Sequence, residues 1–161
     1  MDDHERFMRL ALEQATAARR AGEVPVGAVV VLDGEVVGEA HNASLALSDP
    51  TAHAEILALR RAGARLGNYR LVGGTLYSTV EPCLMCLGAA IHARVRRLVY
   101  GAPDPKAGAI ARVEAMRSDG AEFNHRVESV GGVLADDAAL LLLDFFRERR
   151  GVADGEVPKR S

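Results

Sequence analysis

Two short motifs contain the residues of this chain whose types and spacing could bind a metal ion. The first runs from His53 to Glu55 with the sequence HAE, and the second runs from Pro82 to Cys86 with the sequence PCLMC, directly after Glu81. Together they contain both cysteines of the 161-residue chain. One imidazole and two thiolates suit zinc, and three protein ligands leave the fourth position of its tetrahedron to water. The pattern therefore indicates a hydrolytic zinc site.

Each motif is predicted to lie at the start of a helix, where the helix dipole favours thiolates. Cys83 and Cys86 are three residues apart, so both side chains lie on one face of a helix that we expect Pro82 to open. Zinc lowers the pKa of a bound water from about 15.7 to about 7, and Glu55 can accept that proton and return it to a leaving nitrogen. Residues i and i+2 of a regular helix point in nearly opposite directions, so His53 and Glu55 can act together only if their helix starts irregularly.

The hydrophobic periodicity predicts an α/β fold. Asp33-Gly34 between two β-branched runs indicates a hairpin, and a helix between the last two strands permits a parallel connection. Asp49 or Thr51 is expected to cap the second helix, after a loop at residues 43–50. We therefore expect three α/β/α layers, with helices on both faces of a mixed five-stranded sheet. The expected strands cover residues 26–32, 36–40, 71–80, 96–100 and 127–130, and the expected helices cover residues 2–22, 51–66, a segment from 82, 110–116 and 136–149.

Composition and charge limit the classes of protein to consider. Hydrophobic residues make up 48% of the chain, enough for one globular domain, which we place at residues 1–150, with residues 151–161 as a flexible C-terminal tail. No apolar run approaches the length of a membrane span, and the N-terminus lacks a signal-peptide pattern, so we expect a cytoplasmic protein. A net charge of −2 gives no support to a dedicated nucleic-acid binder, so such a partner would need a local basic patch.

The zinc signature and the segments around it resemble one known family. His-x-Glu together with Pro-Cys-x-x-Cys is the signature of zinc nucleobase deaminases. From about Phe7 to Arg150 the chain resembles the bacterial tRNA-specific adenosine deaminases, which have a cytidine-deaminase-like fold. His41 and Pro103 differ from the residues usual in that family. The matching segments are Asp49–Ile56, Asn68–Leu71, Thr75–Tyr77, Glu81–Cys86, Gly101–Ala102, Lys106–Gly108, Asn124–Arg126 and Asp144–Arg147.

The resemblance implies an activity and a set of site residues. The family consists of hydrolases that act on the C–N bond of a cyclic amidine, converting adenosine to inosine at wobble position 34 of a tRNA anticodon, usually as homodimers. By resemblance, His53, Cys83 and Cys86 would hold one zinc ion per subunit, and Glu55 would be the catalytic proton shuttle. The residues implied in substrate binding are Asn42 at the flipped base, Ala54 beside it, and Asp104, Lys106 and Phe146 at the anticodon loop.

Other interpretations remain open. A small-molecule deaminase of a free base or nucleoside, such as guanine or cytosine, would share the zinc signature, and the acidic net charge favours it. The matches at Asn124–Arg126 and Phe145–Arg147 favour the tRNA enzyme. A non-enzymatic partner subunit would keep the fold but need not retain Glu55, and a structural zinc module would need a fourth protein ligand. Asn42 and Asp104 could also be ordinary turn residues.

Overall fold

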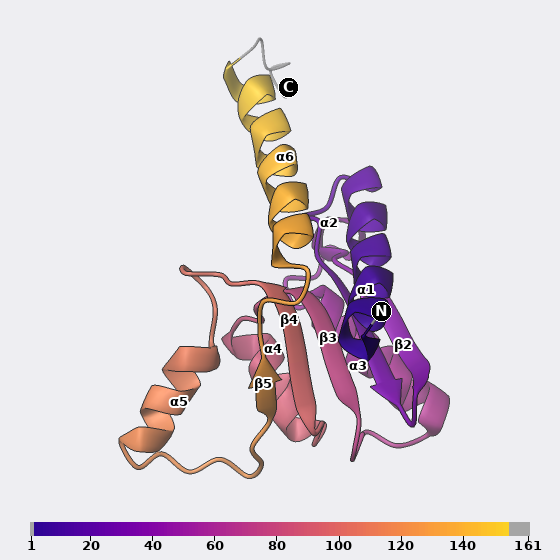
Figure 1. Cartoon of the computed structure of the whole chain (residues 1–161). Helices are drawn as coiled ribbons and strands as arrows, with labels where there is room; N and C mark the ends of the chain where they lie inside the picture. The colour runs from indigo at the N-terminus through magenta and orange to yellow at the C-terminus, as the bar shows by residue number, and fades with distance from the viewer. Residues whose placement is uncertain (1, 155–161) are drawn as a thin grey trace.

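The structure is a computed structural model, and it describes residues 2–154. Five strands form one mixed sheet in the order β2-β1-β3-β4-β5, and helices cover both of its faces (Figure 1), which confirms the predicted three-layer fold. The strands are β1 (Gly27–Leu32), β2 (Glu35–His41), β3 (Thr75–Val80), β4 (Arg97–Ala102) and β5 (Glu128–Val130). The helices are α1 (Asp3–Arg20), α2 (Ser44–Leu47), α3 (Ala54–Leu66), α4 (Leu84–His92), α5 (Ile110–Ser118) and α6 (Ala135–Asp154).

One hairpin and two parallel connections set the topology of the sheet. Asp33 and Gly34, which join β1 to β2, have φ angles of 50° and 78°, the left-handed values that a type I′ hairpin turn requires. β1 pairs antiparallel with both β2 and β3. β3 pairs parallel with β4, and β4 pairs parallel with β5, with α4 and α5 as the crossover helices. The predicted hairpin and the predicted parallel connection before the last strand are both confirmed.

Alternating strand residues supply two separate cores. Val30 and Leu98 belong to a buried cluster that includes residues of α3 and α4. Val29 and Val99, which neighbour them in sequence, belong to a second cluster with residues of α1. Because successive side chains of a strand point to opposite faces, the two clusters must lie on opposite sides of the sheet. Figure 1 agrees, since α1 lies in front of the sheet and α3 and α4 lie behind it.

Two element boundaries differ from the prediction because of contacts between distant segments. The predicted loop at residues 43–50 contains the short helix α2. The carboxylate of Glu23 accepts the N–H groups of Leu45 and Ala46 at 3.0 and 2.9 Å, which stabilises the first turn of α2. The third strand begins at Thr75 instead of residue 71, because the four residues before it form a turn in which Gly73 has a φ of 83°.

The C-terminal boundary also differs. α6 continues to Asp154, so residues 151–154, predicted to belong to a tail, are helical. The remaining tail residues, 155–161, lie outside the described residues. The predicted end of the domain at residue 150 therefore falls within a helix. Among residues 2–154 no helix is both long and apolar enough to cross a bilayer.

Candidate active site

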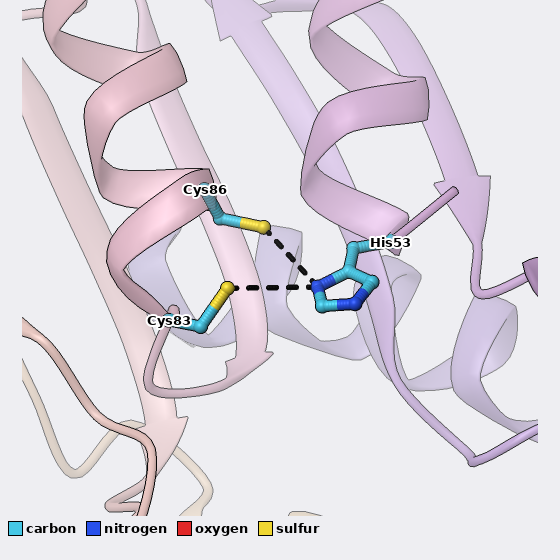
Figure 2. Close-up of side chains that lie close together, drawn as sticks. All are labelled: His53, Cys83 and Cys86. Atoms are coloured by element: carbon cyan, nitrogen blue, oxygen red, sulfur yellow. Dashed lines mark hydrogen bonds between the residues drawn. The ribbon is translucent and has the colours of Figure 1, made fainter. Parts of the chain in front are cut away.

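The histidine and the first cysteine of the two motifs each lie directly before a helix. His53 precedes α3 with φ and ψ of −76° and 152°, and Cys83 precedes α4 with φ and ψ of −74° and 175°. Both residues therefore have extended backbones, although the carbonyls of His53 and Cys83 accept the N–H groups of Leu57 and Leu87 at 3.0 and 2.9 Å. The three motif side chains converge in the space between the starts of α3 and α4 (Figure 2).

The start of α3 corrects the predicted cap. Asp49 closes its own turn, since its Oδ1 accepts the N–H and the hydroxyl of Thr51 at 2.8 and 2.7 Å. The N–H of Ala54, the first residue of α3, donates instead to Oδ1 of Asn42 at 2.8 Å. Neither Asp49 nor Thr51 therefore caps the helix, and a residue that ends the β1–β2 hairpin does. The substrate residue expected at position 42 thus also fixes the start of the helix that follows the candidate ligand.

Three side chains form a group that can hold a metal ion. Nδ1 of His53 lies 3.6 Å from Sγ of Cys83 and 3.5 Å from Sγ of Cys86, and the three atoms lie within 4.8 Å of one another. A zinc tetrahedron with Zn–S of about 2.3 Å and Zn–N of about 2.05 Å has an N···S edge of about 3.6 Å. The donor types and their separations therefore fit zinc. No fourth histidine, cysteine or carboxylate of residues 2–154 joins the group, which argues against a structural module.

The sulfur atoms of the two cysteines lie close together, as predicted, although their helix starts later than expected. α4 begins at Leu84, so Pro82 does not open it. Cys83 is the capping residue, and Cys86 is the third residue of the helix. A capping side chain lies beside the third residue of its helix, so the two sulfurs still face one ion.

The irregular start required for His53 and Glu55 is also present. His53 is extended and Glu55 is the second residue of α3, so the opposite directions expected within a regular helix do not apply. Both residues line the same cavity. Glu55 is only 4% exposed, and its Oε1 has no hydrogen-bond partner among the described residues. A buried carboxylate oxygen without a protein partner, beside a metal-binding group, is available to a reacting water.

Burial and hydrogen bonds shift the pKa values of these groups. Burial raises the pKa of Glu55, which keeps a proton available nearer neutral pH. Hydrogen bonds from Cys86 and then from His53 lower the pKa of Cys83 to about 4. The bond to Cys83 and burial raise the pKa of Cys86, and the contact with Cys83 raises the pKa of His53. Without a metal, one sulfur therefore carries the first negative charge, and metal binding must displace the remaining protons.

A cavity of about 140 Å³ brings together residues from four loops at one edge of the sheet. Five of the predicted site residues line the cavity: Asn42, His53, Glu55, Cys83 and Asp104. Four other residues also line it, and the sequence predicted no role for them: Val26, Val80, Glu81 and Ala107. Glu81 carried one sequence signal, since it is a charged residue between a buried strand and a candidate ligand. The two valines are strand-end residues without such a signal.

The remaining predicted site residues lie around this cavity. Cys86 is fully buried and does not line the cavity, and the backbone N–H of Ala54 is already bonded to Asn42. Lys106 is exposed in the same loop as Asp104, to whose Oδ1 its N–H donates at 3.1 Å. Phe146 lies on α6, 43% exposed and packed edge-on against Phe145. Their contacts with a substrate stay predictions.

Comparison with known proteins identifies the family. Residues 1–102 match the model of the cytidine and deoxycytidylate deaminase zinc-binding region. The tRNA-specific adenosine deaminase of Haemophilus influenzae is 50% identical over 147 residues, which cover 91% of this chain and 84% of that protein. The chain belongs to the tRNA-specific adenosine deaminases.

Two solved structures resemble the structure of this chain. One comes from a study of A-to-I editing by tRNA:A34 deaminases at the wobble position of transfer RNA. It has a TM-score of 0.79 and 44% identity, covering 85% of this chain and 99% of that one. The other, a guanine deaminase from Nitrosomonas europaea, has a TM-score of 0.71 and 28% identity, covering 88% of this chain and 83% of that one. The matched zinc-binding region and the fitting donor group together make zinc the cofactor.

Proposed function

We propose that this protein converts adenosine to inosine at wobble position 34 of a tRNA anticodon, by hydrolytic deamination, as a zinc enzyme of the cytoplasm. In this proposal His53, Cys83 and Cys86 are the zinc ligands. The observation that carries it is the buried, unpartnered oxygen of Glu55, in one cavity with a three-donor metal group among the described residues. Family membership supplies the substrate class.

The reaction replaces the amine at C6 of adenine by oxygen from water, and ammonia leaves. Zinc, when bound, supplies an acidified water as the nucleophile. Glu55 takes a proton from the attacking water and delivers it to the departing nitrogen, so that no net proton is gained or lost by the protein. A raised pKa suits this role, because the carboxyl group must both accept and release a proton near neutral pH.

Asn42 is the proposed contact to the base edge. Its Oδ1 is occupied by the N–H of Ala54, which fixes the orientation of the amide group and leaves Nδ2 as a donor. The cavity of about 140 Å³ is smaller than the 300–1,000 Å³ common for drug-sized ligands, so it suits one base rather than several nucleotides. A target base must leave its stack to enter, which costs least in a single-stranded loop.

The test compares substrates that differ only in the target. An anticodon stem-loop with adenosine at position 34, the same stem-loop with guanosine there, free adenosine, guanine and cytosine are each incubated with the zinc-loaded protein. We expect inosine only in the first RNA, detected as adenosine read as guanosine in cDNA, together with ammonia release. Ammonia from guanine or cytosine, with unchanged RNA, would support the small-molecule alternative. That alternative has less support, because the guanine deaminase is less similar than the tRNA enzymes.

We also propose that the protein forms the homodimer implied by its family. A hollow of about 780 Å³ lies on the outer surface between α3 and α4, away from the metal group, and apolar residues such as Ile56 and Leu59 line it. Tyr69, at its rim, is 68% exposed. Sedimentation equilibrium of the wild type and of Tyr69→Ser tests the proposal. A monomeric wild type would refute it, and a weakened dimer in the variant would assign it to this surface.

A further inference from the structure

Glu81 lies where the strand that leads to a candidate zinc ligand ends. Its backbone N–H donates to the carbonyl of Ala102 at 2.8 Å, which extends the parallel pairing of β3 and β4 by one residue. Two residues later the chain reaches Cys83. The backbone of Glu81 is therefore held by the sheet on one side and by the start of α4 on the other, so its side chain has a fixed origin.

The side chain of Glu81 bonds both ends of the loop between β4 and α5. Oε1 accepts the N–H of Asp104 at 3.1 Å, and Oε2 accepts the N–H of Ile110 at 3.3 Å. One carboxylate thus joins the second residue of the 103–109 loop to the first residue of α5. Carboxylates bonded by backbone N–H groups form charge-assisted hydrogen bonds, which are stronger than neutral ones.

Gly108 shows how closely the loop surrounds this carboxylate. A Cβ atom at position 108 would lie 2.3 Å from Oε2 and 2.4 Å from Cδ of Glu81, and 2.5 Å from the carbonyl oxygen of Asp104. Contacts this short do not occur between real atoms, so a side chain here would displace the carboxylate or the loop. The absence of a side chain at residue 108 is therefore part of the same arrangement.

The loop is also tied to the ligand segment directly and is ordered internally. The N–H of Ala109 donates to the carbonyl of Pro82 at 3.0 Å. Within the loop, Oδ1 of Asp104 accepts the N–H groups of Lys106 and Ala107 at 3.1 and 3.0 Å. The loop is therefore one ordered unit, and its bonds to Glu81 and Pro82 set where that unit lies relative to the metal group.

The position of this unit decides the shape of the cavity. Asp104 and Ala107 line one wall, while His53 and Glu55 line another. We propose that Glu81 is a positioning residue that holds the 103–109 loop at a fixed distance from the zinc-ligand segment, and so sets the shape of the cavity that receives the target base. The substrate half of this inference rests on the proposed function, and the loop half does not.

The first measurement reads the loop without activity. Hydrogen–deuterium exchange of the zinc-loaded wild type should show protected amides at Asp104 and Ile110. Glu81→Gln keeps the size of the side chain but replaces one acceptor oxygen by an NH₂ group, which cannot accept a backbone N–H. We expect exchange at one of the two amides to rise about tenfold in this variant. Unprotected amides in the wild type, or unchanged exchange in the variant, would overturn the proposal.

The second measurement reads the substrate. With zinc content unchanged, Glu81→Gln should raise KM for the anticodon stem-loop about tenfold and change kcat less than threefold. Glu13→Gln, on the exposed face of α1, removes the same charge and should leave KM unchanged. Gly108→Ala displaces the loop without altering charge and should reproduce the rise in KM. A faster-exchanging loop with a wild-type KM would show a merely structural role and reject the proposal.

Amide exchange and the KM measurement together separate the role of Glu81 from the proposed function. If the wild type does not deaminate the RNA at all, the proposed function fails, and exchange at Asp104 and Ile110 still decides whether Glu81 holds the loop. If Glu81→Gln does not fold, Gly108→Ala and the protection of the wild-type amides decide the same question.

Discussion

Replacing Glu55 by glutamine tests the proposed chemistry most directly. Glutamine has the shape of glutamate but cannot accept a proton from water at neutral pH. General acid–base groups contribute factors of about 10² to 10⁴, so we expect kcat to fall by that factor, or about 3 to 5.5 kcal/mol of transition-state stabilisation. Glu55 is not part of the three-atom donor group, so zinc should remain stoichiometric in the variant.

The stability of the same variant should not fall, and the sign follows from the pKa. Burial raises the pKa of Glu55 in the folded chain above its ordinary value of 4.5. As pH rises through the window between those two values, the unfolded chain has released its proton and the folded chain has not, so stability is lost. Glutamine does not titrate, so metal-free Glu55→Gln should gain stability over the wild type as the pH rises above 4.5, the ordinary pKa of the carboxyl group. Urea denaturation at a series of pH values measures this gain.

Glu23 offers a matched control. It is 2% exposed, but both of its oxygens accept backbone N–H groups of α2. Glu23→Gln leaves one N–H without an acceptor, so we expect a loss of about 1 to 3 kcal/mol in unfolding free energy and less than a tenfold change in kcat. Urea denaturation measures the opposite changes in stability that we expect of the two variants. Single-turnover deamination and metal analysis measure their activity and zinc content. A Glu55→Gln enzyme with kcat within tenfold of the wild type, or without zinc, would refute the assignment of Glu55.

Four further substitutions have defined outcomes. Cys86→Ser should reduce bound zinc from one equivalent to nearly none and abolish deamination. A chelator should do the same to the wild type until zinc is restored. Mass-spectrometric metal analysis measures the bound zinc in both experiments. Gly38→Ala should destabilise by about 3 kcal/mol, because its Cβ would lie 2.4 Å from the carbonyl oxygen of Ala58. A Cβ at Gly88 would meet no described atom within 4 Å apart from its chain neighbours and the backbone of its own helix, so Gly88→Ala should stabilise α4 by about 0.5 to 1 kcal/mol. Thermal melts compare the two glycine variants. Burial raises the pKa of Tyr77 from 10 to about 12, so wild-type stability should fall between those pH values, and Tyr77→Phe should remove that fall in alkaline denaturation.

The sequence predicted the sheet because its signals are local. β-branched runs, the Asp33-Gly34 turn and the helical periodicities depend only on neighbours in the chain, and all five strands and the main helices appear. The metal group was predictable for the same reason. Cys83 and Cys86 are close through helix geometry alone, and His53 needed only the expectation that two helix starts lie side by side.

The parts that could not be predicted depend on distant partners. Asp49 is a good capping residue by type, but the cap of α3 comes from Asn42, which lies twelve residues earlier. α2 is too short to be stable by itself, and its first turn depends on Glu23, more than twenty residues away. The bonds of Glu81 to Asp104 and Ile110 likewise join residues more than twenty positions apart in the sequence. No local pattern identifies the distant backbone N–H groups that these glutamates bond once the chain is folded.

The topology of the sheet explains why such partners are needed at this edge. β1 is antiparallel to β2 and β3, so Val26 before β1 meets the residues that follow the ends of its neighbours, and the N–H of Asn42 donates to its carbonyl at 3.1 Å. β4 is parallel to β3 and ends at the same edge, which delivers Asp104. The ends of four strands thus supply the cavity, but the large apolar side chains of α2, Leu45 and Leu47, are 68% and 56% exposed and do not anchor that segment in the core. A carboxylate can accept two backbone N–H groups at once, so one glutamate can hold a segment in place without hydrophobic packing. Glu23 holds the segment that follows Asn42, and Glu81 holds the loop that contains Asp104. The zinc ligands are thus positioned by helix starts, and the flanking segments are positioned by hydrogen bonds to carboxylates.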